Sequence, residues 1–321
     1  MKYIILGAGG VGSYYGAKLV DGGCEVLFVA RGEHLKALKK EGLKLSSLNY
    51  SFEAKVQVSS LEELNQKEIE STDVIILAAK STATNDIAKQ LMPLYFTCKN
   101  QPYILSIQNG VENEEILCQY FPKQKVIGGL TRKIGAHIIK PGIVEVAGSA
   151  VETIIGAWQK QIDDENILDT ISADIKKSNL KCEVVPDIKL ELWKKLVINN
   201  GVNAICALLH VKTGVVMQHK KISKIVYGLM GETAIAGQRV GVAISKKDID
   251  AMFNLISNFD SIKPSMLVDR EFKRPLEIEE ICGVVLRYSD ELGIDAPYTR
   301  TVSSLLEFIY AQEVSFIKKE F

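Results

Sequence analysis

Three polar residues in the second half of the chain have the types and the spacing that a catalytic site requires. Lys195, Asn199 and Asn203 are four residues apart, so in a helix they lie along one face. Most of their neighbours are apolar, and burying an ammonium group and two amides without partners is costly. The stripe is therefore expected to face a polar cleft, where the ammonium group can stabilise negative charge on an oxygen and then protonate it. The alternative is an exposed polar face of an amphipathic helix, where Asn is a less favourable choice than Glu or Lys.

Two further polar residues follow this stripe. Ser265 stands after Lys263-Pro264, and Glu277 stands two residues after Pro275. Proline suits the first turn of a helix, so the sequence predicts Glu277 within that turn, where negative charge is favourable by default. The residues alone give neither side chain a catalytic role.

The first residues of the chain predict where a dinucleotide binds. A short apolar strand runs into a G-x-G-x-x-G turn, and an amphipathic helix follows at once. The first glycine allows the tight turn, the second lets the backbone approach a pyrophosphate, and the third lets the helix pack on the strand. The helix N-terminus then offers amide groups and partial positive charge to the phosphates. The predicted cofactor-binding residues here are Gly7, Ala8, Gly9, Gly10, Val11 and Gly12.

The end of the second predicted strand, 25–30, indicates which dinucleotide is bound. An Asp or Glu at this place would bind an adenosine ribose 2′-hydroxyl, but the chain has Ala30 and then Arg31. A guanidinium group can pair with a 2′-phosphate, so Arg31 predicts NADPH rather than NADH. An exposed arginine without this role is the alternative, and Glu33 close by weakens the case slightly.

Two more candidates follow the next two predicted strands. Lys80 comes after 73–79, and Asn109 comes after 103–108. Ligands of an open α/β sheet bind outside the carboxyl ends of its strands, so both residues are expected to face the crevice of the glycine turn. Lys80 would complement an anionic group, and Asn109 would hold the nicotinamide or its ribose. The alternatives are a surface lysine and a turn-forming Asn-Gly pair.

These residues are carried by an alternation of strands and helices that predicts an α/β fold, a Rossmann-type doubly wound sheet followed by an all-helical C-terminal domain. The predicted strands of the first half are 3–7, 25–30, 73–79, 103–108 and 125–130, with helices near 11–21, 33–41, 82–92 and 112–120. Residues 42–58 are expected to form an inserted hairpin, and antiparallel strands within 134–157 to extend the sheet. From about Pro186 helical periodicity predominates, at 188–210, 220–240, 246–257, 275–292 and 298–314. We therefore predict an NADP-binding domain over 1–185 and a helical substrate and catalytic domain over 186–321.

Composition limits the possible partners. Lys plus Arg and Asp plus Glu both number 39, and no basic run has the density of a nucleic-acid patch. No apolar stretch is long enough to cross a bilayer. The six cysteines are scattered singly, without metal-like spacing to the four histidines, which predicts no metal site and buried thiols in a reducing cytoplasm. A small molecule is the expected partner, and the sequence leaves open whether the protein is a monomer or a homodimer.

Taken together, the motifs resemble those of the ketopantoate reductase (2-dehydropantoate 2-reductase) family over nearly the whole chain. The most specific part is Trp-x-Lys-Leu with two trailing asparagines, followed by a serine and, twelve residues later, a glutamate. The matching residues are Gly7–Gly12, Arg31, Lys80, Gln108–Gly110, Trp193–Leu196, Asn199, Asn203, Ser265, Arg274 and Glu277.

The resemblance implies NADPH-dependent reduction of ketopantoate to pantoate, on the route to pantothenate and coenzyme A. It implies that Lys195 binds the substrate and acts as the general acid, with Glu277 as its orienting partner. Asn199, Asn203 and Ser265 would bind the carboxylate and hydroxyl of the substrate. Asn109 would lie near the nicotinamide and the substrate, and Arg31 on the 2′-phosphate.

The chain departs from the family pattern at two positions. Thr213 stands where another asparagine is common, and Cys282 replaces the asparagine of a common acid-x-x-Asn-Gly pattern. Both lie on the expected substrate side, so they put the exact 2-keto acid in doubt more than the reaction type. The remaining alternatives are a reductase of a different small 2-keto acid and a regulator that senses NADPH without catalysis.

Overall fold

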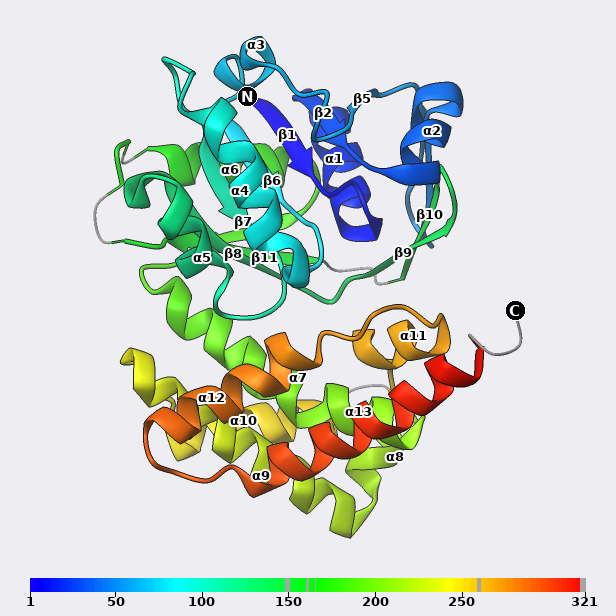
Figure 1. Ribbon diagram of the computed structural model, residues 1–321, viewed down its shortest axis with the longest axis vertical. Helices are drawn as coiled ribbons and strands as arrows, with labels where there is room; N and C mark the ends of the chain where they lie inside the picture. Colours follow the sequence, from blue (N-terminus) through cyan, green and yellow to red (C-terminus); the bar gives the residue numbers. More distant parts are fainter. Residues whose placement is uncertain (148–150, 160–161, 165, 259–260, 318–321) are drawn as a thin grey trace. The chain divides into compact units, whose positions relative to one another are not determined.

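The computed structural model describes residues 1–147, 151–159, 162–164, 166–258 and 261–317. The chain divides into two compact units, Met1–Ile188 and Lys189–Phe321. The first is an α/β unit and the second is helical (Figure 1). Within the described part of the chain, no helix combines the length and the apolar character needed to span a membrane.

The α/β unit is built on an eight-stranded sheet with the order β12-β11-β8-β7-β6-β1-β2-β5. The strands from β5 to β8 in this order are parallel, β11 is antiparallel to β8, and β12 is parallel to β11. Central strands such as β6 are apolar throughout because both faces of the sheet are covered. The strands are β1 (Lys2–Leu6), β2 (Glu25–Val29), β5 (Gln57–Ser59), β6 (Val74–Leu77), β7 (Tyr103–Ser106), β8 (Val126–Arg132), β11 (Glu152–Ala157) and β12 (Lys181–Val184).

Helices cover both faces of this sheet. Figure 1 shows α4 in front of the sheet and α6 behind it; α4 contacts α5, and α6 contacts α1. The helices are α1 (Gly10–Asp21), α2 (Gly32–Glu41), α3 (Gln66–Glu70), α4 (Thr84–Tyr95), α5 (Asn113–Tyr120) and α6 (Ile167–Lys177), with short 3₁₀ turns at Ser81–Ala83 and Lys123–Lys125. The doubly wound fold predicted from the sequence is confirmed, whereas α3, α6 and β12 were not predicted.

A second sheet has the order β4-β3-β10-β9, with β3 (Leu43–Ser46), β4 (Ser51–Ala54), β9 (Gly135–Lys140) and β10 (Ile143–Ala147). The hairpin predicted within 42–58 is confirmed as β3 and β4. The prediction that all strands within 134–157 extend the main sheet is correct for β11 but wrong for β9 and β10, because β10 pairs with β3 and β9.

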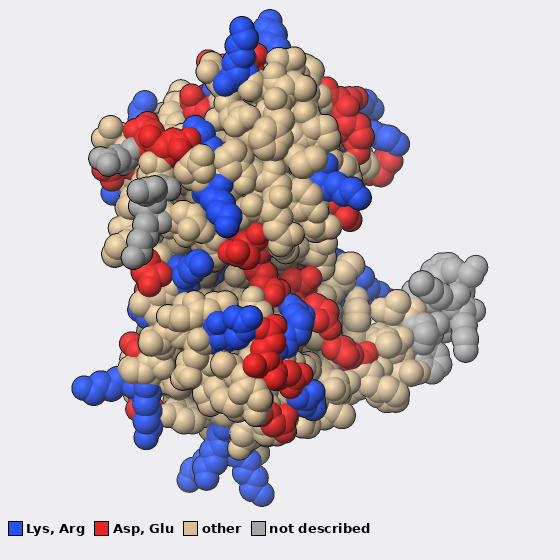
Figure 2. Space-filling model, turned by 60° about the vertical axis from the view of Figure 1, so that its left-hand side comes forward, with Lys and Arg blue, Asp and Glu red and all other residues tan. Residues whose placement is uncertain are grey.

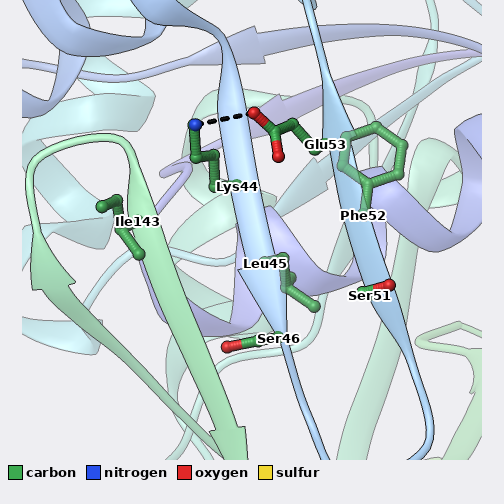
Figure 3. A pocket seen from close by; sticks show the side chains of 7 residues that line it. All are labelled: Lys44, Leu45, Ser46, Ser51, Phe52, Glu53 and Ile143. Carbon is green, nitrogen blue, oxygen red and sulfur yellow. Dashed lines mark ion pairs between the residues drawn. The ribbon is translucent and has the colours of Figure 1, made fainter.

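The alternation of side chains explains this second sheet. Leu45 and Phe52 are buried, while Lys44 and Glu53 are exposed and form an ion pair of 2.6 Å across β3 and β4 (Figure 3). The apolar face needs a partner, and α1 supplies it, since α1 contacts β3, β9 and β10 as well as β1 and β2. Helix α1 therefore lies between the two sheets.

The helical unit is formed around α7 (Ile188–Leu209) and α9 (Lys220–Gly237). The other helices are α8 (Thr213–Gln218), α10 (Lys246–Ser257), α11 (Ser265–Glu271), α12 (Val284–Glu291) and α13 (Pro297–Ile317), with a 3₁₀ turn at Gln238–Val240 and a π-helical turn at Glu279–Gly283. The predicted long helices are present, but the short helices α8 and α11 were not predicted. Their six and seven residues offer too little periodicity to recognise.

Candidate functional site

The glycine turn at the end of β1 has a distinct geometric reason for each of its three motif glycines. Gly7 has a φ of +92°, and a Cβ there would lie 2.6 Å from the Ala79 nitrogen. A Cβ on Gly12 would overlap the Gly7 carbonyl oxygen, so this glycine permits the close packing of α1. A Cβ on Gly9 would meet only the Gly7 oxygen, at 4.0 Å, so the backbone at Gly9 borders open space that a phosphate group can occupy.

The first amides of α1 form the anion-binding end of this turn. The bond from Ser13 N to Gly9 O, at 2.9 Å, is the first of the helix, so the amides of Gly10, Val11 and Gly12 have no acceptor within it. Together with the helix dipole they favour a phosphate. The amide of Ala8 instead donates to Val29 O at 2.8 Å. Ala8 therefore shapes the turn and does not present its amide to a ligand.

Arg31 is exposed at the N-cap of α2, two residues after β2 ends. Glu33, whose charge would disfavour a 2′-phosphate, forms an exposed ion pair of 2.7 Å with Lys36 on the same helix. Its charge is therefore partly compensated by a neighbour within α2. Arg31 therefore lies just after β2, where the sequence predicts a contact with a 2′-phosphate.

Strand order brings four predicted positions to one edge of the sheet. Strands β2, β1, β6 and β7 are consecutive neighbours and parallel, so Arg31, the glycine turn, Lys80 and Asn109 follow four adjacent strand ends. Lys80 is exposed at the start of the 3₁₀ turn that precedes α4. The arrangement agrees with the rule that open α/β sheets bind ligands at their carboxyl edge.

Gln108 holds two of these loops together. Its buried side chain donates from Nε2 to Ala79 O and to Thr84 Oγ1, both at 3.0 Å. The next residue, Asn109, accepts a bond from Asn113 Nδ2 on its backbone oxygen at 2.6 Å. The family motif Gln-Asn-Gly thus contributes a structural bridge through its first residue, a role that the sequence did not reveal because a buried glutamine carries no distinctive pattern.

Helix α7 is continuous, so Lys195, Asn199 and Asn203 share one face as the spacing predicts. Lys195 and Asn199 are partly exposed, and Asn203 is buried. The opposite face anchors the helix, where Trp193 stacks on Tyr288 of α12 with ring centroids 5.9 Å apart. Because the face with Trp193 is anchored, the face that carries Lys195, Asn199 and Asn203 points in a fixed direction.

A buried polar network sets the rotation of α7. Asn200 follows Asn199 by one residue and is fully buried; its Nδ2 donates to Thr233 Oγ1 at 2.9 Å and to Thr299 Oγ1 at 3.1 Å. Glu232 accepts from the amides of Tyr298 and Thr299 at 2.8 and 2.7 Å. This carboxylate therefore caps the N-terminus of α13 from the side of α9.

The predicted position of Glu277 within a first helical turn is wrong. The helix begins at Ile278, and Glu277 is a buried residue just before it. Upstream, the Arg274 amide donates to Asp269 O at 2.8 Å, and the Arg274 oxygen accepts from Tyr310 Oη at 2.6 Å. Because this oxygen is engaged by Tyr310, it does not accept the first hydrogen bond of a helix, and residues 274–277 have no regular secondary structure. Ser265 is exposed at the first residue of α11.

The two residues that depart from the family pattern lie in different surroundings. Thr213 is bonded to the backbone of Ile262, whose amide donates to Thr213 Oγ1 at 3.1 Å. Cys282 is completely buried in the π-helical turn, and burial raises the pKa of its thiol to about 12. Thr213 is therefore engaged by the backbone, and Cys282 is a neutral buried thiol.

Comparison with known proteins supplies the family. The model described as ketopantoate reductase PanE/ApbA matches residues 3–160, and the model of the C-terminal part of the same family matches residues 187–310. The chain belongs to the ketopantoate reductase family. The 2-dehydropantoate 2-reductase of Archaeoglobus fulgidus is 31% identical over 303 residues, which cover 94% of this chain and 95% of the relative. The corresponding enzyme of a Nostoc species is 30% identical over 315 residues, covering 96% and 95%.

Solved structures share this fold. The 2-dehydropantoate 2-reductase of Geobacter metallireducens has a TM-score of 0.85 and 30% identity, covering 96% of this chain and 100% of that one. A D-mandelate dehydrogenase with bound NADH has a TM-score of 0.88 and 23% identity, covering 97% and 99%, a likeness of fold. As a ketopantoate reductase family member, the protein is an oxidoreductase that acts on a CH–OH group and uses a nicotinamide cofactor.

Proposed function

We propose that the protein reduces 2-dehydropantoate to pantoate with NADPH, in pantothenate and coenzyme A biosynthesis. The observation that carries this proposal is the identity of 30–31% to enzymes named for that reaction, over nearly the full length of both chains. The residues that the family resemblance assigns to this reaction are present in the chain. Arg31 at the end of β2 favours the phosphorylated dinucleotide.

The dinucleotide fits the α/β unit through the features of the glycine turn. Open space borders Gly9, and the first three amides of α1 are available to a phosphate. Lys80 and Asn109 follow the neighbouring strands, on the side where the nicotinamide end would extend. When bound, the nicotinamide supplies the hydride that reduces the keto carbon.

The side chains of the helical unit supply the proton and the substrate contacts. As the keto carbon is reduced, negative charge grows on its oxygen, and the Lys195 ammonium stabilises that charge and donates a proton to it. Glu277 would orient the ammonium group. Asn199, Asn203 and Ser265 would bind the substrate carboxylate and hydroxyl, which fixes the keto carbon for attack.

The surface and the cysteines support a small-molecule enzyme of the cytoplasm. Basic and acidic side chains are mixed on the face shown in Figure 2, where uncharged areas separate them. All six cysteines are free thiols, as expected in a reducing compartment. We infer a cytoplasmic enzyme that works as a monomer or a homodimer and binds no nucleic acid.

The test is NADPH oxidation by the purified protein with a panel of 2-keto acids that includes 2-dehydropantoate. We expect turnover of 2-dehydropantoate far above that of the other acids, and much slower turnover with NADH. Faster turnover of another acid would reassign the substrate. Binding of NADPH without turnover of any acid would favour a sensing regulator, and equal use of NADH would contradict the role of Arg31.

A further inference from the structure

A half-buried histidine close to the glycine turn has no part in the predicted site. His34 lies in the first turn of α2, three residues after Arg31. Its Nδ1 accepts a hydrogen bond of 3.0 Å from the amide of Gly142, in the turn between β9 and β10. A ring nitrogen that accepts is unprotonated, so the neutral ring carries its proton on Nε2.

The other side of the ring faces the glycine turn. Nε2 is buried and has no hydrogen bond of good geometry within the described structure. Burial is the larger effect on the ring and lowers the pKa of His34. The backbone of Ala8 lies on this side and partly offsets that effect by raising the pKa. The ring is therefore neutral at neutral pH and directs a buried N–H group toward the turn that would hold the phosphates.

A second contact also joins the glycine turn to the second sheet. A Cβ on Gly10 would overlap the backbone of Ala136, so the first turn of α1 packs directly on β9. The Gly142 oxygen accepts from the Lys44 amide at 2.9 Å, which fixes the turn to β3. The second sheet thus supports the phosphate-binding end of α1 at β9, and it supports α2 through His34.

We propose that His34 is a positioning residue of the dinucleotide site. Its ring holds the glycine turn and the N-terminus of α2, which carries Arg31, in register against the β9–β10 turn. A donor left buried without a good acceptor is costly. A small movement of the Ala8 carbonyl on nucleotide binding would complete the bond from Nε2 and tighten all three segments. The inference rests on the proposed use of NADPH.

Three variants of the full-length protein separate the two ring nitrogens. His34→Leu removes both polar contacts, His34→Asn retains an acceptor near the position of Nδ1, and His34→Gln retains a donor near Nε2. The matched control is His219→Leu, because His219 also accepts a backbone amide through Nδ1, at 3.3 Å from Ile222, but at the N-cap of α9 in the helical unit. NADPH affinity is measured by the fluorescence of the bound cofactor, together with the KM for each substrate and the thermal midpoint.

We expect His34→Leu to weaken NADPH binding about tenfold, with the KM of the keto acid little changed. His34→Asn and His34→Gln should each recover part of the loss, and His219→Leu should bind NADPH as the wild type does. Wild-type affinity in His34→Leu overturns the inference, and so does an equal loss in all three His34 variants.

A measurement on the unmodified protein covers the case in which His34→Leu does not fold. Bound NADPH should slow hydrogen exchange at the amide of Gly142, because completing the Nε2 bond tightens the ring against this turn. Unchanged exchange at Gly142 would count against the role of His34. If the wild-type protein does not bind NADPH, the proposed cofactor fails as well; if it binds and neither readout responds, only the role of His34 fails.

Discussion

At the scale of single residues, Lys195 is expected to contribute to the chemical step and not to cofactor binding. Lys195→Ala removes the proton donor, and general acid catalysis is typically worth about 10²–10⁴-fold. We expect kcat to fall by this factor while NADPH affinity stays within about threefold. The control is Lys194→Ala, since Lys194 is the residue before Lys195 on α7 and forms an ion pair of 2.9 Å with Glu191. Near-normal turnover in Lys195→Ala would show that Lys195 is not the proton donor.

Two glycines of the same motif should respond differently to one added methyl group. Gly9→Ala adds a methyl group in open space, so we expect normal stability but a loss of NADPH affinity of tenfold or more. Gly12→Ala forces the methyl group onto the Gly7 oxygen, so α1 must shift and the thermal midpoint should fall as well. Both variants are compared by thermal unfolding and NADPH titration. Equal destabilisation in the two would contradict the proposed phosphate approach at Gly9.

At the scale of elements, the cap that α9 provides for α13 should stabilise the helical unit. Glu232→Gln keeps the size of the side chain but places an NH₂ group among amides that need acceptors, so unfolding should become about 1–3 kcal/mol easier. Glu33→Gln is the control, because its ion pair is exposed and worth little. Urea denaturation measures both variants. An unchanged midpoint in Glu232→Gln would show that the cap does not stabilise the unit.

The same scale shows what the sequence could predict. The sequence predicts strands with continuous apolar runs and helices with long periodicity. It also predicts that the residues after four strands lie at one edge of the sheet, because ligands of open α/β sheets bind at the carboxyl ends of the strands. The partner of β10 was not predictable, because an alternating strand indicates one buried face but not which sheet it joins. The start of the helix after Glu277 was not predictable either. It depends on the bond from Tyr310 to the Arg274 oxygen, and these residues are 36 positions apart in the chain.

At the scale of the whole molecule, stability should fall toward acid in two stages. Burial holds the folded pKa of His34 below its ordinary 6.5. As pH falls below about 6.5 the unfolded chain therefore binds a proton that the folded chain does not, and stability decreases. Carboxylates with a lowered pKa, such as Glu313 beside Arg270 and Glu152 beside Lys133, stabilise the folded chain above their ordinary pKa and lose this effect at lower pH. The raised pKa of Glu280 acts in the opposite direction.

His34→Asn isolates the first of these stages. The ionisable residues within three positions of the ring and its two backbone partners are Arg31, Glu33, Lys36, Lys140 and Glu145, and all of them stay in the variant. Between pH 7.5 and pH 5 we expect the wild type to lose more stability than His34→Asn, measured by urea denaturation at each pH. The variant cannot take up a proton at this position, so its curve should stay flatter until the carboxylates titrate. Parallel curves for the two proteins would mean that His34 has the same pKa folded and unfolded, and the enclosure of its ring by the glycine turn and the second sheet would then have no effect on its ionisation.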